Sequence, residues 1–226
     1  MFVLGREILD ILEEVFMDIS KITVNFHSSI RVDAGKILYF DPFKISEGVN
    51  DADYIFITHD HYDHFSVEDI KKLANADTIY VVPENMERKV RANIDSNRIF
   101  LVKQAEQYDI EGLKFETVAA YNKLKPFHSR KDGWCGYIVD VDGERVYVAG
   151  DTDFTKEASD VKCDVAIVPI GGTYTMNSKD AAKLINKIKP KVAIPVHYGG
   201  IIGTIGDADK FMGLVDEDIK VEVKIK

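Results

Sequence analysis

Short runs of β-branched and aromatic residues dominate the first part of the chain, and such runs are typical of β-strands. They occupy Ile22–Phe26, Ile30–Val32, Ile37–Phe40 and Tyr54–Thr58. Gly35 supplies a turn between the second and third runs, which predicts a small antiparallel start. The pattern then changes to strands that alternate with helices. The predicted elements are a helix that starts at Ser66, a strand over Ile79–Val82 and a helix over Glu84–Ile94.

The second half of the chain repeats this order. A β-rich block runs from Ile99 to Val148, and its Asp142-Gly143 turn is a hairpin signal between Tyr137–Val141 and Arg145–Val148. Alternation follows, with a strand over Val165–Val168, a helix whose apolar face includes Ala181, Ala182, Ile185 and Ile188, a strand over Val192–Val196, a helix over Phe211–Val215 and a strand over Ile219–Ile225. Two similar halves predict an α/β (α+β) fold with two sheets packed together and helices outside them.

A helical face precedes the first strand. Its apolar positions are Ile8, Ile11, Leu12, Val15 and Ile19. This spacing predicts an amphipathic helix that packs on the same domain, and a contact between two copies of the chain is the alternative. At 226 residues the chain is long enough for one substantial core and short for two domains of usual size. We therefore expect a single domain over residues 1–226.

Composition and charge narrow the class of protein. Hydrophobic residues make up 46% of the chain and charged residues 30%, which are values of an ordinary globular protein and exclude a disordered or collagen-like chain. The formal net charge of −9 disfavours nucleic acid as a partner. There is no apolar run of membrane-spanning length, and acidic residues come too early for a signal peptide, so we expect a cytoplasmic protein without a membrane partner. Cys135 and Cys163 lack a paired metal spacing, and both are predicted to be buried thiols outside the site.

The segment after the strand Tyr54–Thr58 carries the candidate chemistry. Within six positions it contains three histidines and two aspartates: His59, Asp60, His61, Asp63 and His64. Residues that leave a strand two positions apart can turn the same way, so His59 and His61 can grip one ion, while Asp63 and His64 can serve a second. A solvated polar loop is the alternative, but such a density of ionisable groups is seldom kept without a ligand.

These residues follow the pattern His-x-His-x-Asp-His, and further marks appear in order along the chain. They are Asp41 in Phe40-Asp41-Pro42-Phe43, Gly150-Asp151-Thr152 after a strand, and His197 in Val196-His197-Tyr198-Gly199. In these features nearly the whole chain resembles the metallo-β-lactamase superfamily of metal-dependent hydrolases. The resemblance implies a four-layer αββα sandwich with the site at the edges of its sheets.

The resemblance also implies a set of metal ligands. His59 and His61 correspond to ligands of a first metal, while Asp63, His64 and His197 correspond to ligands of a second, and Asp151 corresponds to a carboxylate that bridges both ions. Taken alone, Gly150-Asp151 is more typical of an ordinary turn, and His197 after an apolar strand is more typical of a core histidine. The donor set suits two zinc ions, with manganese or iron as alternatives, because neutral imidazoles favour borderline ions.

One position departs from the family pattern. A third histidine for the first metal is usual between the motif and the Gly-Asp-Thr turn, and Asn122 stands in the aligned segment Val118–Asn122. His128, a few residues later, is the candidate replacement. The alternatives are Asn122 as a weak oxygen ligand, or a site that holds a single metal.

Two further segments resemble the lactonase-like branch of the superfamily, which includes ascorbate-6-phosphate lactonase and many uncharacterised hydrolases. They are Asn25–Ser29, which contains His27, and the loop Gly171–Met176. We expect His27 to lie beside the ligands or in the pocket, and a plain strand histidine is the alternative. Tyr174 and Met176 are expected to line the pocket.

The ligand set favours hydrolysis, in which Asp63 or Asp151 orients a metal-activated water and takes its proton. We expect an ester, lactone or phosphodiester of a small molecule as the substrate. A non-haem iron dioxygenase of the same fold keeps the same motif and remains an alternative. A weakly metal-binding sensor or scaffold without catalysis is the other. An oligomer through the N-terminal helix is compatible with the sequence.

Overall fold

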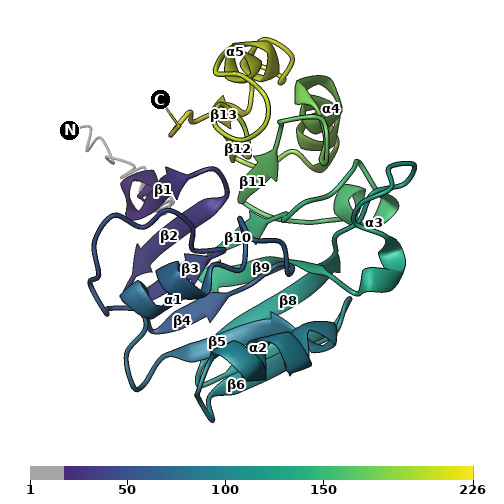
Figure 1. Cartoon of the computed structure of the whole chain (residues 1–226). Helices are drawn as coiled ribbons and strands as arrows, with labels where there is room; N and C mark the ends of the chain where they lie inside the picture. The colour runs from purple at the N-terminus through teal and green to yellow at the C-terminus, as the bar shows by residue number, and fades with distance from the viewer. Residues whose placement is uncertain (1–17, 226) are drawn as a thin grey trace, which may run out of the picture.

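The computed structural model of the protein describes residues 18–225, which form two β-sheets, five α-helices and three short 3-10 helices (Figure 1). The first sheet contains six strands in chain order. They are β1 (Ile22–Phe26), β2 (Ser29–Ala34), β3 (Lys36–Phe40), β4 (Tyr54–Phe56), β5 (Ile79–Pro83) and β6 (Ile99–Val102). Neighbours from β1 to β3 are antiparallel, whereas β3 to β6 are parallel.

The second sheet likewise has an antiparallel part followed by a parallel part. Its seven strands are β7 (Gln107–Ile110), β8 (Leu113–Ala119), β9 (Cys135–Val141), β10 (Glu144–Val148), β11 (Val165–Pro169), β12 (Val192–Val196) and β13 (Lys220–Val221). Neighbours from β7 to β10 are antiparallel, and β10 to β13 are parallel. The inner parallel strands β4, β5, β11 and β12 are continuous buried runs, because helices and the other sheet cover both faces.

Helices cover the outer face of each sheet. α1 (Val67–Leu73) and α2 (Glu87–Asn93) pack their apolar sides on the first sheet. α3 (Lys156–Ser159), α4 (Ser178–Ile188) and α5 (Gly206–Met212) cover the second sheet, with α4 and α5 beside its parallel strands (Figure 1). The 3-10 helices are η1 (Ile19–Lys21), η2 (Glu84–Met86) and η3 (Arg130–Asp132).

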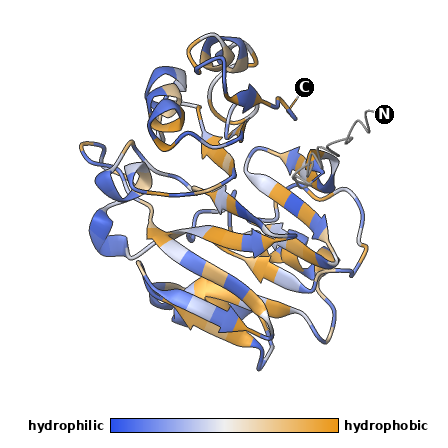
Figure 2. Cartoon of the chain, turned by 180° about the vertical axis from the view of Figure 1, so that it is seen from behind, coloured by the Kyte–Doolittle hydropathy of each residue, from blue (hydrophilic) through white to orange (hydrophobic). Residues whose placement is uncertain are grey.

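Three buried hydrophobic clusters separate these four layers. The central cluster lies between the sheets, where Phe56 stacks on Phe40 at 4.8 Å and meets the edges of Tyr137 and Phe115 at 5.1 and 5.3 Å between ring centroids. Viewed from behind, hydrophobic and hydrophilic residues alternate along the strands of the second sheet, as expected where one face is buried (Figure 2). The αββα architecture predicted from the two similar halves is therefore confirmed.

The carboxyl ends of several strands meet at one edge of the sandwich. In the first sheet β1, β3 and β4 end there, because these three strands run in the same direction. In the second sheet β8, β10 and β12 end at the corresponding edge. The backbone N–H of His197, after β12, donates to the carbonyl of His27, after β1, at 3.0 Å and joins the two edges.

The end of the chain differs from the sequence-based expectation. A helix was expected over Phe211–Val215, but α5 begins at Gly206 and ends at Met212, where Gly213 follows. The strand expected over Ile219–Ile225 is limited to Lys220–Val221. Pro195 of β12 explains this limit, because its position faces β13 and it has no backbone N–H to extend the parallel ladder.

Further predictions concern the N-terminal segment, the number of domains and the two cysteines. The amphipathic helix predicted from residue 8 onwards lies outside the described residues up to position 17, and Ile19 begins η1. The single-domain prediction includes those residues and stays a prediction. Cys135 is buried as expected, whereas Cys163 is only half-buried and corrects the prediction for that thiol. Across residues 18–225, every helix falls short of the length and hydropathy that a bilayer crossing requires.

Candidate metal centre

Asp41 organises the loop that carries the histidine-rich motif. Its carboxylate accepts hydrogen bonds from the backbone N–H and the hydroxyl of Thr58, at 2.7 and 2.6 Å, and from His64 Nδ1 at 2.7 Å. Because the Thr58 hydroxyl donates its only proton to Asp41, it accepts the 2.9 Å hydrogen bond from His59 Nδ1. Both His59 and His64 are thus fixed by Nδ1, which leaves the lone pair of each Nε2 for a ligand.

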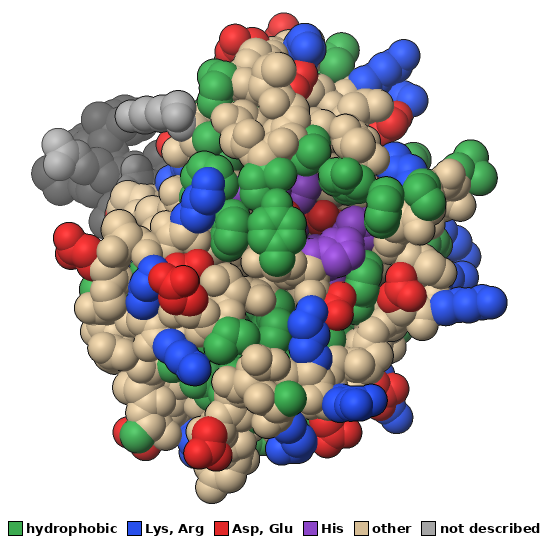
Figure 3. All heavy atoms as spheres, viewed as in Figure 1, with side chains coloured by type: hydrophobic (Ala, Val, Ile, Leu, Met, Phe, Trp, Pro, Cys, Tyr) green, Lys and Arg blue, Asp and Glu red, His purple; other side chains and the backbone are tan. Residues whose placement is uncertain are grey.

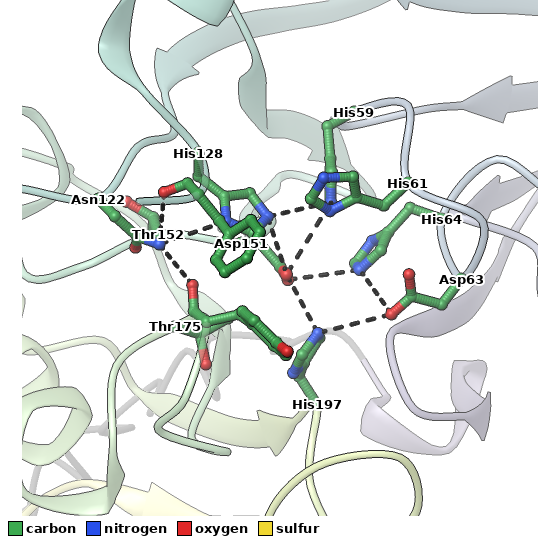
Figure 4. A network of polar contacts seen from close by, with 12 residues as sticks. His59, His61, Asp63, His64, Asn122, His128, Asp151, Thr152, Thr175 and His197 are labelled. Atoms are coloured by element: carbon green, nitrogen blue, oxygen red, sulfur yellow. Dashed lines mark hydrogen bonds and ion pairs between the residues drawn. The ribbon is translucent and has the colours of Figure 1, made fainter. Parts of the chain in front are cut away.

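One group of donors consists of three imidazoles. His59 Nε2 lies 3.2 Å from His61 Nδ1 and 3.3 Å from His128 Nε2. The three nitrogen atoms converge from two loops, one after β4 and one between β8 and β9 (Figure 4). Trp134 packs against all three rings, with centroid distances of 4.9 to 5.2 Å, and limits their rotation.

A second group contains Asp63, His64 and His197. His64 Nε2 lies 3.6 Å from Asp63 Oδ2, and His197 Nε2 lies 3.9 Å from the same oxygen. Within residues 18–225, neither Nε2 atom has a hydrogen-bond partner although both are buried. Buried polar atoms normally find a partner, so these atoms indicate a ligand between them.

Asp151 lies between the two groups, at the turn after β10. Its Oδ2 is 3.3 Å from His128 Nε2 and 3.1 Å from His197 Nε2, while its Oδ1 is 3.4 Å from His64 Nε2 (Figure 4). His59 Nε2 is 3.9 Å from Oδ2. One carboxylate therefore faces donors of both groups, which is the placement that a bridging ligand needs.

The structure distinguishes His128 from Asn122. The amide nitrogen of Asn122 donates to the carbonyls of Tyr174 and Phe127, at 2.6 and 3.1 Å, and lies 3.3 Å from His128 Nδ1. The backbone N–H of Asn122 also donates to the carbonyl of His128 at 2.7 Å. Asn122 thus holds the loop that presents His128, and it is His128 that joins His59 and His61.

His27 lies at the turn between β1 and β2, on the far side of the second group. It is buried, its Nε2 is 3.4 Å from Asp63 Oδ2, and its ring centroid is 3.8 Å from that of His197. His27, Asp63 and His197 therefore form a further cluster of donor atoms within 4.8 Å of one another. This places His27 beside the donor atoms of the second group.

The electrostatics of the centre separate neutral from charged groups. Burial and the neighbouring imidazoles hold the pKa of His59 well below its usual value, so that side chain is neutral and offers a lone pair. Burial also lowers the pKa of His64, but the carboxylates of Asp151 and Asp41 outweigh it and raise this pKa to about 9. For Asp151, burial raises the pKa, and the positive potential of His197 and His64 holds it well below its usual value. A cation therefore competes with a proton for His64 Nε2.

The backbone is strained at several of these positions. His27, Asp41, His128 and His197 all have positive φ, at 57°, 46°, 59° and 58°. Non-glycine residues rarely adopt this left-handed region, and such outliers concentrate at functional sites because the surrounding structure enforces them. Each of these residues leaves a strand or a loop at a sharp turn, which aims its side chain at the centre.

A cavity of about 310 Å³ opens above the donors. Its floor is formed by His61, Asp63, His128, Asp151 and His197. Its wall is formed by Tyr62, Phe127, Tyr174, Ile201 and Ile202. The expectation for Tyr174 agrees with this position, and the ring packs edge-on against Phe127 at 5.1 Å. Met176 differs from the expectation, because its side chain lies in the buried cluster beneath α4 and not in the cavity wall.

Sequence reasoning missed Trp134 and most of the cavity wall. Trp134 is the only tryptophan of the chain. Its position in the sequence does not predict that it is buried beside three imidazoles. Ile201 and Ile202 follow the His197 segment in a glycine-rich stretch, so no periodic pattern marks them. Their role depends on how that loop folds back over the site.

The donor set fits divalent metal ions. It offers neutral imidazole nitrogens and carboxylate oxygens, the ligand types that zinc, manganese and iron share. Imidazole nitrogen atoms face one another at 3.2 to 3.3 Å, and buried atoms of His64, Asp151 and His197 lack hydrogen-bond partners within residues 18–225. A bound cation would satisfy both arrangements. The side chains of residues 18–225 thus form groups able to hold metal.

Fold and site together define an αββα protein whose sheet edge carries histidine and aspartate groups able to hold metal. Residues 21–197 match the family model described as a Beta-lactamase superfamily domain. The chain therefore belongs to the metallo-β-lactamase superfamily, as the motifs predicted.

Relatives and solved structures agree with this membership. A protein of Staphylothermus marinus named a metal-dependent hydrolase is 33% identical, over 81% of this chain and 79% of its own. One of Pyrococcus furiosus with the same name is 29% identical, over 90% and 95%. A crystal structure from Parabacteroides distasonis, classed provisionally as a metal-dependent hydrolase, has a TM-score of 0.75 and 30% identity, and the match covers 91% of this chain and 93% of that one.

More distant structures share only the fold. A diiron β-hydroxylase from Streptomyces venezuelae has a TM-score of 0.67 at 13% identity, and the match covers 90% of this chain and 52% of that one. At this identity the similarity carries no statement about chemistry, because one fold hosts many reactions.

Proposed function

We propose that the protein is a metal-dependent hydrolase that uses a metal-activated water to cleave an ester, lactone or phosphodiester bond of a small molecule. One observation carries the proposal: Asp151 lies between two groups of buried donors directly beneath a cavity of about 310 Å³. Relatives named metal-dependent hydrolases support the same class.

We propose that the two donor groups hold two zinc ions, with manganese or iron as alternatives. His59, His61 and His128 would hold one ion. Asp63, His64 and His197 would hold the other, and Asp151 would contact both. A carboxylate between two dications offsets their repulsion, which neutral imidazoles cannot do.

The side chains around the ligands have separate tasks in the reaction. Bound metal ions of this kind lower the pKa of water and stabilise negative charge on the substrate oxygen. Asp63 borders the cavity and can take the proton of the attacking water on its carboxylate. Asp41 keeps His64 oriented through Nδ1, and Trp134 keeps the three imidazoles of the first group in place. The cavity wall would hold the substrate above the donors.

Metal analysis of protein purified without chelator tests this function. We expect two equivalents of metal per chain, together with hydrolysis of at least one ester, lactone or phosphodiester in a substrate panel. One equivalent of iron and oxygen-dependent turnover would instead support a dioxygenase. Absence of metal after incubation with zinc and with manganese would support a sensor or scaffold and contradict the proposal.

The third ligand of the first group can be tested separately. His128→Ala is expected to reduce the bound metal from two equivalents to one, because two imidazoles bind an ion far more weakly than three. Asn122→Asp is the matched comparison: it keeps the shape of the side chain but loses the donor to the Tyr174 carbonyl, so it should weaken the loop without removing the ion. Metal content after dialysis and thermal unfolding distinguish the two variants. Loss of the ion in Asn122→Asp with full metal content in His128→Ala would reverse the assignment.

A further inference from the structure

The wall of the cavity above the donors is apolar and open to solvent. Tyr62, Phe127 and Ile201 expose 66%, 47% and 36% of their surface, values that are high for large hydrophobic side chains. Hydrophobic side chains surround the histidine and carboxylate atoms that are visible at the surface (Figure 3). Single exposed apolar residues are ordinary, but a group that frames a polar floor indicates a binding surface.

Acidic side chains line the cavity, and none of the side chains that line it is Lys or Arg, as judged over residues 18–225. Its floor contains Asp63 and Asp151, whose charge the proposed metal ions would offset. Sites for phosphate or carboxylate groups normally supply Arg or Lys in addition to a metal ion. A charged group away from the reacting bond would therefore lie against apolar side chains and lose its hydration without a partner.

Nearby cations are engaged elsewhere. Lys44 Nζ lies 4.1 Å from the centroid of the Phe26 ring. Lys125 Nζ pairs with Asp153 and donates to the carbonyl of Thr175 at 2.6 Å. Lys89 Nζ pairs with Asp60 at 3.1 Å, outside the donor set. None of these three lysines lines the cavity.

The wall also limits the size of the substrate. A volume of about 310 Å³ is at the lower end of the roughly 300–1,000 Å³ found for ligand pockets. Phe127 and Tyr174 meet edge-on at 5.1 Å, and Tyr62 meets Phe43 edge-on at 5.9 Å. These contacts hold the aromatic rings in place, so the wall presents a stable flat surface to an alkyl or aryl group.

We propose that the substrate is a small carboxylic ester or lactone with an uncharged, apolar acyl chain that lies against Tyr62, Phe127 and Ile201. The inference rests on the proposed hydrolase function and selects among its substrates. In the reaction the water oxygen bonds to the acyl carbon, the bond from that carbon to the alkoxy oxygen breaks, and the alkoxy oxygen takes a proton. The products are a carboxylic acid and an alcohol, or a hydroxy acid from a lactone.

A series of p-nitrophenyl esters tests the inference on the metal-reconstituted protein. From acetate to butyrate to hexanoate we expect kcat/KM to rise by about fourfold per methylene until the cavity is filled, as expected for burial of each group. An ester with a terminal carboxylate should be turned over at least about 100-fold less efficiently than the hexanoate, because a charge away from the reacting bond meets no Lys or Arg side chain among the described residues of the cavity lining. Faster turnover of the carboxylate-bearing ester, or of bis(p-nitrophenyl) phosphate, than of the hexanoate would overturn the inference while leaving the hydrolase function standing.

Variants of the wall make the test specific. Ile201→Lys should lower kcat/KM for the hexanoate about tenfold and reduce the ratio of kcat/KM for the hexanoate to that for the carboxylate-bearing ester. Ile201→Met should keep both parent values, because it retains an apolar side chain of similar size. Lys44→Ala, outside the wall, should change neither. An unaltered chain-length profile in Ile201→Lys would contradict the assigned surface.

A binding measurement separates this inference from the proposed function. Alkyl amides with two to six carbons are not expected to react, and their affinity can be measured by calorimetry on the metal-loaded protein. An affinity that rises about fourfold per methylene supports the apolar wall even if every ester resists hydrolysis, which would contradict only the hydrolase function. An affinity independent of chain length overturns the inference.

Discussion

Asp151→Asn is expected to lower kcat/KM for the best substrate by about 1,000-fold or more and to reduce the bound metal below one equivalent. The substitution keeps the size and shape of the side chain but removes the negative charge that faces His64, His128 and His197. Loss of a side chain that only supports a metal ligand already costs roughly 10–100-fold, so loss of the charge between both donor groups should cost more. Steady-state kinetics and elemental analysis of the same preparation measure the two effects.

Asp60→Asn is the matched control for this variant. Asp60 belongs to the same motif, but its carboxylate turns outward and pairs with Lys89 at 3.1 Å on the surface. Exposed ion pairs contribute at most about 1 kcal/mol, so activity and metal content should stay near the parent values. An Asp151→Asn protein with parental activity and two equivalents of metal would remove Asp151 from the centre.

Gly171→Ala is expected to destabilise the protein by more than about 3 kcal/mol and to disturb the second donor group. A Cβ atom at position 171 would lie 2.2 Å from the carbonyl oxygen of His197 and 3.0 Å from Ile202 Cγ2. Added atoms in a packed interior usually cost about 1–3 kcal/mol, and here the obstacle is backbone that cannot rotate away. The turn after β12 would have to move, and His197 would move with it.

Chemical denaturation and metal analysis of Gly171→Ala check both parts of this result. Gly206→Ala is the control, because the nearest atom to its added Cβ is Thr204 Oγ1 at 3.9 Å and the residue starts α5. Its stability should be unchanged or raised by about 0.4–1 kcal/mol, since alanine restricts the unfolded chain. Equal stability and equal metal content of the two variants would show that the close approach at Gly171 does not constrain His197.

The sequence predicted the elements whose local pattern and final environment agree. The hydrophobic runs at β5, β11 and β12 are buried on both faces, so they were evident as strands. The start of α1 was equally local: Ser66, where the helix was predicted to begin, accepts a hydrogen bond from the backbone N–H of Asp69. The extent of β13 was not predictable in this way, because it depends on the missing N–H of Pro195 in a neighbouring strand.

The same distinction between local pattern and distant contacts applies to the residues of the candidate metal centre. The motif residues His59 to His64 were evident because they are consecutive and follow one strand. The role of Asn122 was not, because it depends on hydrogen bonds to the carbonyls of Phe127 and Tyr174 in two different loops. Met176 was misplaced for a similar reason: the backbone bridge between Gly171 and Asn177 turns its side chain away from the cavity. Contacts between distant segments decide these positions, and they leave no periodic signal.

The left-handed backbone at His27, His128 and His197 costs stability at the positions that present donor atoms to the centre. Glycine adopts this conformation without steric penalty, so replacing any of the three histidines by glycine would relax the main chain while deleting a donor. Histidine with this backbone strain is therefore expected to persist only where its donor atom is needed. Homologues that have lost the metal-dependent activity should be recognisable by glycine at these three positions, with the rest of the fold intact.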